Sequence, residues 1–320
     1  SKEKKQIQDI LSSDKKIWAV VQNELQEIDE KFGDKRRTKI KTIELVEYNP
    51  EDFIEHEDAY LVISKNGWLR KFKTVVEPNT LKYKENDSLL AAVKANTREF
   101  VAFFTSRGMV YVFKLYNLTY TRTGFGEPIQ NLFKFSDGEK VVSVLSLDPA
   151  ELAATTKLLT GKTSKKPSRQ TRLSFADGEN SGLEGMIVGS SGYGFRFTLT
   201  SLIETTRSGR KLMTLKSDDK LVGFSLVTGD HLFMASISGK GIVIPVEQVA
   251  LLTGAGMGSR LMKMTNSSLA GFKVVNKNDH STITLEDEKI KRINIKDIRV
   301  TNRGGQGVII SKRKKITAIE

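Results

Sequence analysis

The chain contains no cysteine and few histidines, which narrows the chemistry available to it. Its 320 residues include no Cys and three His. Without cysteine, the sequence excludes disulfide bonds, thiolate zinc sites and cysteine nucleophiles. The histidines His56, His231 and His280 are far apart and lack metal-ligand spacing, so we expect no metal site. No apolar run approaches the roughly 20 residues that a transmembrane helix needs, so we predict no membrane partner.

Positive charge is in excess, and it is unevenly placed. The chain carries 51 Lys and Arg against 38 Asp and Glu, a net charge of +13. Residues 1–40 hold ten basic and eight acidic residues, so +11 falls on the remainder. A basic excess on one folded region points to a polyanion partner, nucleic acid before an anionic surface. A basic but inert surface is the alternative.

The first 32 residues have the apolar spacing of helices. Two apolar stripes, over residues 7–11 and 17–32, recur at three- and four-residue intervals. Ser13 suits an N-cap between two helices, and Gly33 a stop after the second. The chain begins at Ser1 and not at methionine, and we expect it to be part of a longer protein.

A two-part sequence motif recurs through the rest of the chain. A β run broken by a tight glycine turn is followed about 16 residues later by a glycine cluster, usually with an arginine. The paired glycines are Gly108 and Gly124, Gly192 and Gly209, and Gly239 and Gly256. β-rich repeats of roughly 40–50 residues are typical of propeller blades. The sequence therefore predicts a mainly β fold of five blades, with six as the alternative, after a short N-terminal α-helical segment.

The blades are expected to follow the repeats in order. The first contains a hairpin with Asn66-Gly67 at its turn, and its second half, residues 81–87, lacks the glycine cluster. The others are predicted at about 95–145, 184–223, 224–270 and 271–320. The polar stretch between blades two and three, about 148–183, is predicted to be an irregular basic insertion. A flexible arm onto DNA and a solvated loop are both open interpretations of it.

Three stretches resemble one known family. Residues 24–40 resemble the end of the long coiled coil in the A subunit of bacterial type IIA topoisomerases, DNA gyrase and topoisomerase IV. Residues 86–94 and 124–129 resemble parts of the C-terminal domain that follows it, a β-pinwheel. The resemblance implies that residues 1–40 are the end of the coiled-coil helices with a linker, and that residues 41–320 are a β-pinwheel DNA-binding domain.

The resemblance also implies a function. In this family the pinwheel binds duplex DNA and bends or wraps it around its rim without sequence specificity, and the full enzyme changes DNA topology. The catalytic tyrosine lies in an upstream domain, so we assign no catalytic residue, metal or cofactor to this chain and expect it not to be an enzyme by itself. The implied partners are double-stranded DNA, a second A subunit and the B (ATPase) subunit. ATP and Mg²⁺ are expected at other parts of the full enzyme, in the bacterial cytoplasm at the nucleoid.

One difference from the family pattern indicates which of the two enzymes this chain resembles more. Gyrase A subunits carry the glycine-rich box Gln-Arg-Arg-Gly-Gly-Arg-Gly in the first blade, where this chain has residues 81–87 instead. The nearest match lies in the last blade, at Arg303, Gly304, Gly305 and Gly307. The pattern favours a topoisomerase IV-like role in relaxation and decatenation. Negative supercoiling by a gyrase is the alternative, and a protein-binding propeller scaffold is a third interpretation.

The candidate DNA-binding residues are basic side chains at equivalent positions of the repeats. Binding to closely spaced phosphates requires positive charge along a path, which successive blades can supply. Because no base-reading helix is evident, we expect recognition of the backbone and its bendability. The predicted contacts are Arg70, Lys71, Lys73, Arg107, Lys114, Arg122, Arg196, Arg207, Arg210, Lys211, Lys240, Arg260, Lys263, Lys291, Arg292, Arg303, Lys312 and Arg313.

Overall fold

The chain forms two compact units in the computed structural model, Ser1–Asn49 and Pro50–Glu320. The structure describes residues 2–34, 54–160 and 182–319. The boundary between the units falls outside these residues, as does the predicted boundary at residue 40, which therefore stays a prediction.

The first unit consists of two helices, as the sequence predicts. Helix α1 spans Lys2–Leu11 and α2 spans Asp14–Phe32. Ser13 has extended backbone angles at the N-cap of α2, and the Gly33 N–H closes its last turn on the Asp29 carbonyl. No residue of either helix is buried, and Trp18 and Phe32 are 70% and 79% exposed. Within this unit, much of the two apolar stripes is exposed.

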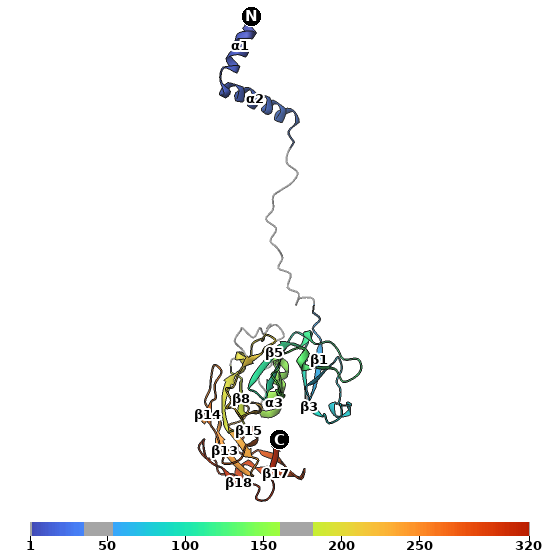
Figure 1. Cartoon of the computed structure of the whole chain (residues 1–320), viewed down its shortest axis with the longest axis vertical. Coiled ribbons are helices and arrows are strands. Elements are labelled where there is room, and N and C mark those ends of the chain that lie inside the picture. Colours follow the sequence, from blue (N-terminus) through green and yellow to red (C-terminus); the bar gives the residue numbers. More distant parts are fainter. Residues whose placement is uncertain (1, 35–53, 161–181, 320) are drawn as a thin grey trace. The chain divides into compact units, whose positions relative to one another are not determined.

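The second unit is built of five antiparallel sheets, which confirms the mainly β, bladed fold. We number the blades in chain order, and Figure 1 shows them following one another around an arc from β1 to β17. Blade 1 contains β1 (Asp58–Ser64), β2 (Trp68–Phe72), β3 (Leu89–Asn96) and β6 (Glu127–Pro128), and blade 2 contains β4 (Phe100–Thr105), β5 (Met109–Lys114), β7 (Val141–Ser146) and β10 (Arg210–Lys211). Blade 3 contains β8 (Glu184–Gly189), β9 (Tyr193–Thr198), β11 (Leu221–Leu226) and β14 (Ser259–Arg260), and blade 4 contains β12 (His231–Ser236), β13 (Lys240–Pro245), β15 (Leu269–Val275) and β18 (Val308–Ile309). Blade 5 contains β16 (His280–Leu285), β17 (Ile290–Asn294) and β19 (Ile316–Ile319).

The first two strands of each blade form a tight hairpin. In blades 1 to 4 the turn glycine has a positive φ, between 72° and 87°, a conformation that side chains disfavour. In blade 5 Glu288 takes this place with φ 61°. After the second strand of blades 2 to 5, the chain makes one 3-10 turn, and similar turns occur at two other places. These turns are η2 (Pro78–Thr80), η3 (Leu115–Asn117), η4 (Ile129–Asn131), η5 (Leu199–Ser201), η6 (Val246–Gln248) and η7 (Ile295–Asp297).

The fourth strand of each complete blade comes from the following repeat. The two-residue strands β6, β10, β14 and β18 each come directly after a glycine cluster, and each pairs with the second strand of the preceding blade. The prediction that each cluster belongs to its own blade is wrong, because the cluster carries the chain back across the junction. Adjacent blades are therefore linked by main-chain hydrogen bonds as well as by packing.

The clusters are rich in glycine because the two backbones approach closely at this crossing. A Cβ on Gly126 would lie 1.9 Å from the Leu69 carbonyl oxygen, and Gly126 has φ +83°. Gly258 would meet the Gly194 oxygen at 2.2 Å in the same way. Contacts this short are impossible for any side chain, so a glycine is required where each donated strand begins.

Blade 5 is the exception, with the sheet order β17-β16-β19. Among the described residues no strand pairs with the outer edge of β17. Ile290, at the position that a donated strand would cover, is 68% exposed, whereas its counterpart Leu69 in blade 1 is fully buried. Lys289 and Lys291 flank it, and lysines on an open edge oppose pairing with another sheet.

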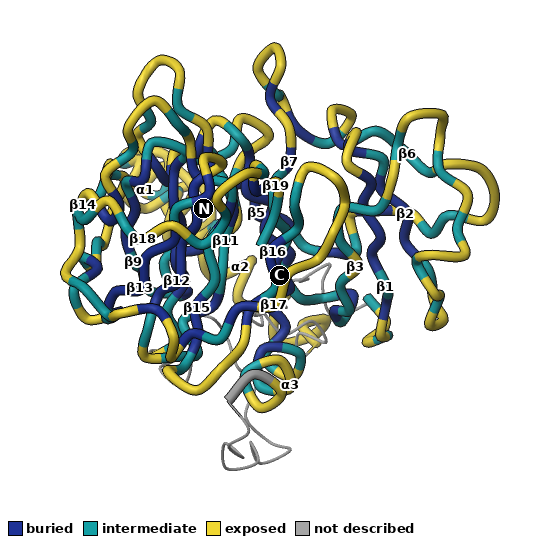
Figure 2. The backbone as a smooth tube through the Cα atoms, turned by 90° about the horizontal axis from the view of Figure 1, so that it is seen from below, coloured by how far each residue is buried: buried dark blue, intermediate teal, exposed yellow. Residues whose placement is uncertain are grey.

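The hydrophobic core lies between neighbouring blades. One cluster joins Ala102 and Phe104 of blade 2 to Ile187 and Phe195 of blade 3, and three others join the remaining adjacent pairs. Figure 2 shows that the buried positions follow the strands and that the exposed ones lie in the connecting loops. The loops at the blade ends are thereby free to carry charge without disturbing the core.

The predicted irregular insertion begins instead with a helix. Residues Pro149–Thr160 form α3, which starts after the Asp148 side chain accepts a hydrogen bond from the Ala150 N–H (2.9 Å). The prediction of irregular structure is therefore wrong for residues 149–160. The basic residues predicted between 161 and 181 lie outside the described residues.

Candidate nucleic-acid interface

A basic groove lies at the junction between blades 2 and 3. Its volume is about 390 Å³, and it brings together residues from four separate segments. Arg107 comes from the hairpin turn of blade 2, Lys134 from the loop before β7, Lys211 from the donated strand β10, and Lys216 from the loop before β11. All four side chains are exposed, so their charges face solvent.

The one acidic residue that lines this groove, Asp219, is already hydrogen-bonded to other groups of the protein. The Asp219 carboxylate accepts hydrogen bonds from the Ser190 hydroxyl (2.5 Å) and from the backbone N–H groups of Ser191 and Lys220 (both 2.9 Å). These bonds tie the start of β11 to the hairpin turn of blade 3. Four cations therefore face one carboxylate that is already hydrogen-bonded, and the groove suits an anion such as a backbone phosphate.

A smaller groove repeats this arrangement at the junction between blades 1 and 2. Its volume is about 230 Å³, and it is lined by Lys65 and Asn66 of the first hairpin turn and by Lys140 before β7. Glu139 takes the place of Asp219 and accepts a hydrogen bond from the Thr105 hydroxyl (2.5 Å). Successive junctions thus present cations at the same end of the strands.

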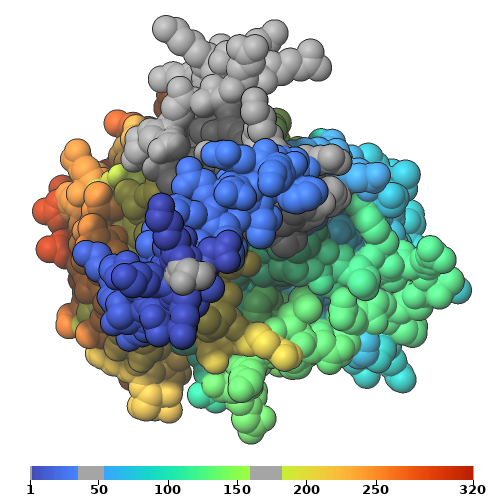
Figure 3. All heavy atoms as spheres, turned by 90° about the horizontal axis from the view of Figure 1, so that it is seen from above, coloured from blue at the N-terminus to red at the C-terminus, as the bar shows by residue number. Residues whose placement is uncertain are grey.

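Most predicted contact residues are exposed on the surface. On the face drawn in Figure 3, the repeats follow one another from cyan through green and yellow to orange, so several blades share the surface. The exposed members are Lys73, Arg107, Arg122, Arg207, Lys211, Arg260, Lys263, Lys291, Arg292, Arg303, Lys312 and Arg313.

Four others are half-buried and already have contacts within the protein. Lys114 lies over the Phe100 ring, with 5.3 Å between its ammonium and the ring centre. Arg210 donates to the Ser201 carbonyl, and Lys240 approaches the Gln306 amide oxygen at 3.5 Å. Arg196 is paired with Glu184 at 2.7 Å. These residues can add charge to the surface but are held by structural contacts.

Arg70 and Lys71 are buried, and we remove both from the set of phosphate contacts. Their exposures are 5% and 2%. The Arg70 guanidinium donates to the Lys82 carbonyl (3.0 Å) and lies over the Tyr83 ring. Basic side chains at these positions hold the blade together instead of facing a ligand.

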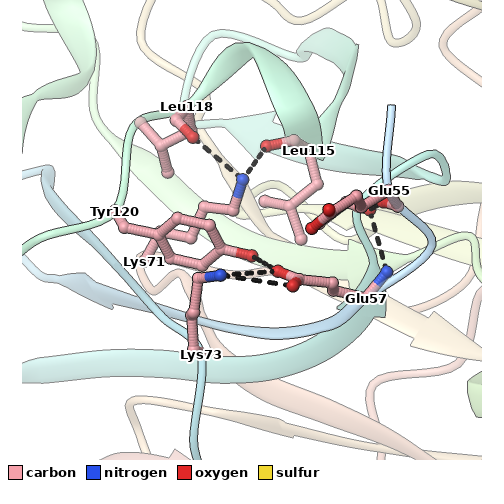
Figure 4. A network of polar contacts seen from close by, with 8 residues as sticks. Glu55, Glu57, Lys71, Lys73, Leu115, Leu118 and Tyr120 are labelled. Carbon is pink, nitrogen blue, oxygen red and sulfur yellow. Dashed lines mark hydrogen bonds and ion pairs between the residues drawn. The ribbon is translucent and has the colours of Figure 1, made fainter. Parts of the chain in front are cut away.

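Lys71 joins blade 1 to blade 2. Its ammonium donates hydrogen bonds of 2.9 Å to the carbonyls of Leu115, the first residue of the η3 turn, and Leu118, which directly follows that turn. It lies 4.3 Å from the centre of the Tyr120 ring. Figure 4 shows the network, in which the Tyr120 hydroxyl donates to Glu57 (3.1 Å). Burial, and then this hydrogen bond, raise the pKa of Tyr120 to about 12.

Arg196 plays the same role between blades 3 and 4. Its Nε donates to the Val249 carbonyl (3.0 Å), and Val249 follows the η6 turn as Leu118 follows η3. Lys71 and Arg196 also each make a parallel bridge to the following repeat. Blades 1 and 3 thus use a basic residue where blades 2 and 4 have Val112 and Val243.

Lys71 is expected to make stability depend on pH. Burial lowers its pKa from 10.5 to about 8, partly opposed by the Glu57 carboxylate. Between pH 8 and 10.5 the unfolded chain therefore binds more protons than the folded one, and this residue's contribution to stability rises with pH in that window. The Lys71→Met variant is expected to lose this rise, measured by urea unfolding, whereas exposed Lys65→Met keeps it. A rise equal to wild type in Lys71→Met would contradict this account.

The groove contains two basic residues, Lys134 and Lys216, that were not among the predicted contacts. Both lie in loops without a regular period, so no strand pattern placed them on one face. One sequence signal could have identified Lys216. It lies five residues before the third strand of blade 3, and Lys84 lies five residues before the third strand of blade 1.

The partial match to the glycine-rich box, at Arg303, Gly304, Gly305 and Gly307, occupies the same position in the fold as the other glycine clusters. Residues 303–307 are the cluster of the fifth repeat, and they lead to β18, which pairs with β13 of blade 4. Gly304 and Gly307 have φ +84° and +74°, and a Cβ on Gly307 would lie 2.5 Å from the Gly241 oxygen. Their counterparts are the clusters at residues 124–126 and 256–258, so the stretch is one of a series.

Two further kinds of site are absent from the described residues. No group of three His, Asp or Glu side chains there could hold a metal ion. No described helix is long and apolar enough to cross a membrane.

The fold and the repeats define the class of this protein as a bladed β domain whose repeats exchange strands. A family model, "DNA gyrase C-terminal domain, beta-propeller", matches residues 99–148, 186–228, 230–276 and 286–316. The chain belongs to this family, the C-terminal domains found in the A subunits of type IIA topoisomerases. The first three strands of blade 1, β1 to β3, lie outside the matched residues.

Relatives of both enzyme types match along almost the whole chain. The A subunit of DNA gyrase from Dehalogenimonas lykanthroporepellens is 25% identical, over 95% of this chain and 42% of that protein. The A subunit of DNA topoisomerase 4 from Salmonella typhimurium is 26% identical, over 100% of this chain and 40% of that protein. The chain thus spans about two fifths of these relatives. The fold is similar to the E. coli ParC C-terminal domain, with a TM-score of 0.62, 21% identity and coverage of 82% of this chain and 98% of that one.

Proposed function

We propose that residues 54–319 bind duplex DNA along a path of cations at the blade junctions and bend it. The groove between blades 2 and 3 carries the proposal, because four exposed cations from four segments line it, and its one carboxylate is already hydrogen-bonded within the protein. The contacts are to the backbone, so binding is independent of sequence. Bending a short site costs about 1–6 kcal/mol, which several phosphate contacts must offset.

Duplex binding measured at several salt concentrations tests this proposal. With six or more phosphate contacts, affinity is expected to fall by about 10³-fold or more between roughly 50 and 200 mM salt. Energy transfer between dyes at the two duplex ends should report a shorter distance when the protein binds. A protein-binding scaffold predicts neither result, so salt-independent or absent duplex binding would refute the proposal.

We infer that the full protein is one of two identical A subunits, that a B (ATPase) subunit joins them, and that ATP and Mg²⁺ are used elsewhere in that enzyme. The relatives, which are subunits of this kind, support this inference. We infer further that the full protein acts in the bacterial cytoplasm at the nucleoid. This chain supplies DNA binding and no catalytic residue.

Between the two enzymes, we propose a topoisomerase IV-like role. Residues 81–87 of the first blade lack the glycine-rich box, and β17 has no donated strand among the described residues. Religation of a nicked plasmid with the protein bound, followed by two-dimensional gel analysis, separates the alternatives. Little trapped writhe is expected for bending, whereas strong writhe of one sign would indicate a gyrase-like wrap.

A further inference from the structure

Two lysines on alternate blades lie against aromatic rings at equivalent positions. The Lys84 ammonium is 3.3 Å from the centre of the Trp68 ring, and the Lys216 ammonium is 4.9 Å from the centre of the Tyr193 ring. Each ring belongs to the first residue of the second strand of its blade, β2 in blade 1 and β9 in blade 3. Each lysine lies five residues before the third strand begins. The two pairs therefore occupy equivalent positions in blades 1 and 3.

The rings also lie next to the donated strands. Trp68 pairs with Pro128 of β6, and Tyr193 pairs with Arg260 of β14. Arg260 donates to the Tyr193 hydroxyl at 3.2 Å and lies over the same ring. Strand donation thus fixes the position of each ring and brings a second cation to Tyr193.

The lysines are exposed and keep their hydrogen-bonding capacity. Neither the Lys84 ammonium nor the Lys216 ammonium forms an ion pair or a hydrogen bond with the described residues, and each contacts an aromatic ring. An aromatic face attracts an ammonium group but leaves its three N–H donors available for an oxygen acceptor. The ring also restricts the side chain before a ligand arrives, which lowers the entropy lost on binding.

The even-numbered blades lack this pair. Blade 2 has Met109 at the ring position and Ser136 at the lysine position, and blade 4 has Lys240 and Met264. The feature thus occurs in blades 1 and 3, the blades that contain Lys71 and Arg196 at the other equivalent basic position; blade 5 lacks it, with Lys289 at the ring position and Ser311 at the lysine position. In blade 3 the lysine also lines the basic groove, where it faces Arg107 and Lys211.

We propose that Lys84 and Lys216, positioned by Trp68 and Tyr193, are phosphate contacts for duplex DNA on blades 1 and 3. This inference rests on the proposed function. It assigns both lysines to DNA contact, with their position set before binding.

Trp68 provides a direct test, because Trp18 is the only other tryptophan. In a Trp18→Phe protein, titration with a duplex of mixed sequence is expected to change the emission of Trp68, because a phosphate that binds the ammonium changes the charge next to the ring. Lys84→Ala is expected to abolish this change while the remaining cations still bind the duplex. Unchanged Trp68 emission at saturating duplex would overturn the proposal for this site.

Affinity measurements test both sites together. Lys84→Ala/Lys216→Ala is expected to lower affinity about tenfold or more at roughly 0.1 M salt and to reduce the salt slope by about 2. The control Lys277→Ala/Lys296→Ala removes equal charge from the other end of the strands and is expected to leave the slope unchanged. Lys84→Arg/Lys216→Arg should restore binding.

The outcomes separate the two proposals. If the wild-type protein binds no duplex, the proposed function fails. If it binds with a steep salt dependence but the double alanine variant matches its control, only the present inference fails. A loss of thermal stability in the double variant with an unchanged slope would likewise overturn it, by assigning the pairs a structural role.

Discussion

Replacing Arg107, Lys134 and Lys211 by alanine is expected to weaken duplex binding by about 100-fold at roughly 0.1 M salt. Each of these side chains is exposed in the groove between blades 2 and 3, and each comes from a different segment. A phosphate contact releases about 0.9 counterion, so losing three contacts should also reduce the slope of log affinity against log salt by about 3.

The matched control removes the same charge from the other compact unit. Lys4, Lys5 and Lys15 are exposed on α1 and α2, and their triple replacement by alanine lowers the net charge equally. It is expected to change affinity less than about threefold, since long-range attraction between exposed charges is screened at this salt. Equal losses in the two triple variants would show that net charge, and not the groove, drives binding.

Gly126→Ala is expected to destabilise the second unit by about 3–5 kcal/mol, because a side chain there prevents β6 from reaching β2. The new Cβ would lie 1.9 Å from the Leu69 carbonyl oxygen, so blade 1 would lose its fourth strand or shift its second. Urea unfolding followed by circular dichroism measures the loss.

Gly124→Ala is the matched control for this substitution. Both glycines have φ +83°, so alanine has the same conformational cost of about 1–2 kcal/mol at either position. A Cβ on Gly124 meets no atom within 4 Å, and only the conformational cost is expected. The difference between the two variants therefore measures the strand crossing itself, and equal losses would rule out the crossing as its cause.

The hairpins were predictable from sequence because their signals are local. Asn66-Gly67 lies between two β runs, and a positive φ at such a turn is a property of the glycine itself. The N-terminal helices were predictable for a similar reason, since the apolar period of α2 extends from residue 17 to residue 32. Helix α3 also had a local signal, with Asp148 before Pro149, that the polar composition of the stretch obscured.

Strand donation was not predictable in this way. A strand of two residues, such as β10, has no period of its own, and its Lys211 pairs with Met109 from an earlier repeat. The glycine clusters marked the crossing, but one sequence cannot show which backbone each glycine approaches.

The candidate site was predictable only as a set. A basic residue in a strand pattern suggests a surface position, and this holds for Arg107 and Lys211. It fails for Lys71, because the two carbonyls that hold its ammonium lie 44 and 47 residues further along the chain. Burial of a lysine depends on acceptors that tertiary structure brings to it.

The interlocked strands have a consequence for how such a domain can gain or lose a unit. Each of repeats 2 to 5 gives a two-residue strand to the blade before it, and each of blades 1 to 4 receives one from the repeat that follows it. Tandem duplication of one repeat in the gene would therefore insert a whole blade without opening any sheet, since the newcomer both gives and receives. Removing the terminal repeat, in contrast, would strip β18 from the blade before it, so blade number can grow within the array more easily than it can shrink at its end.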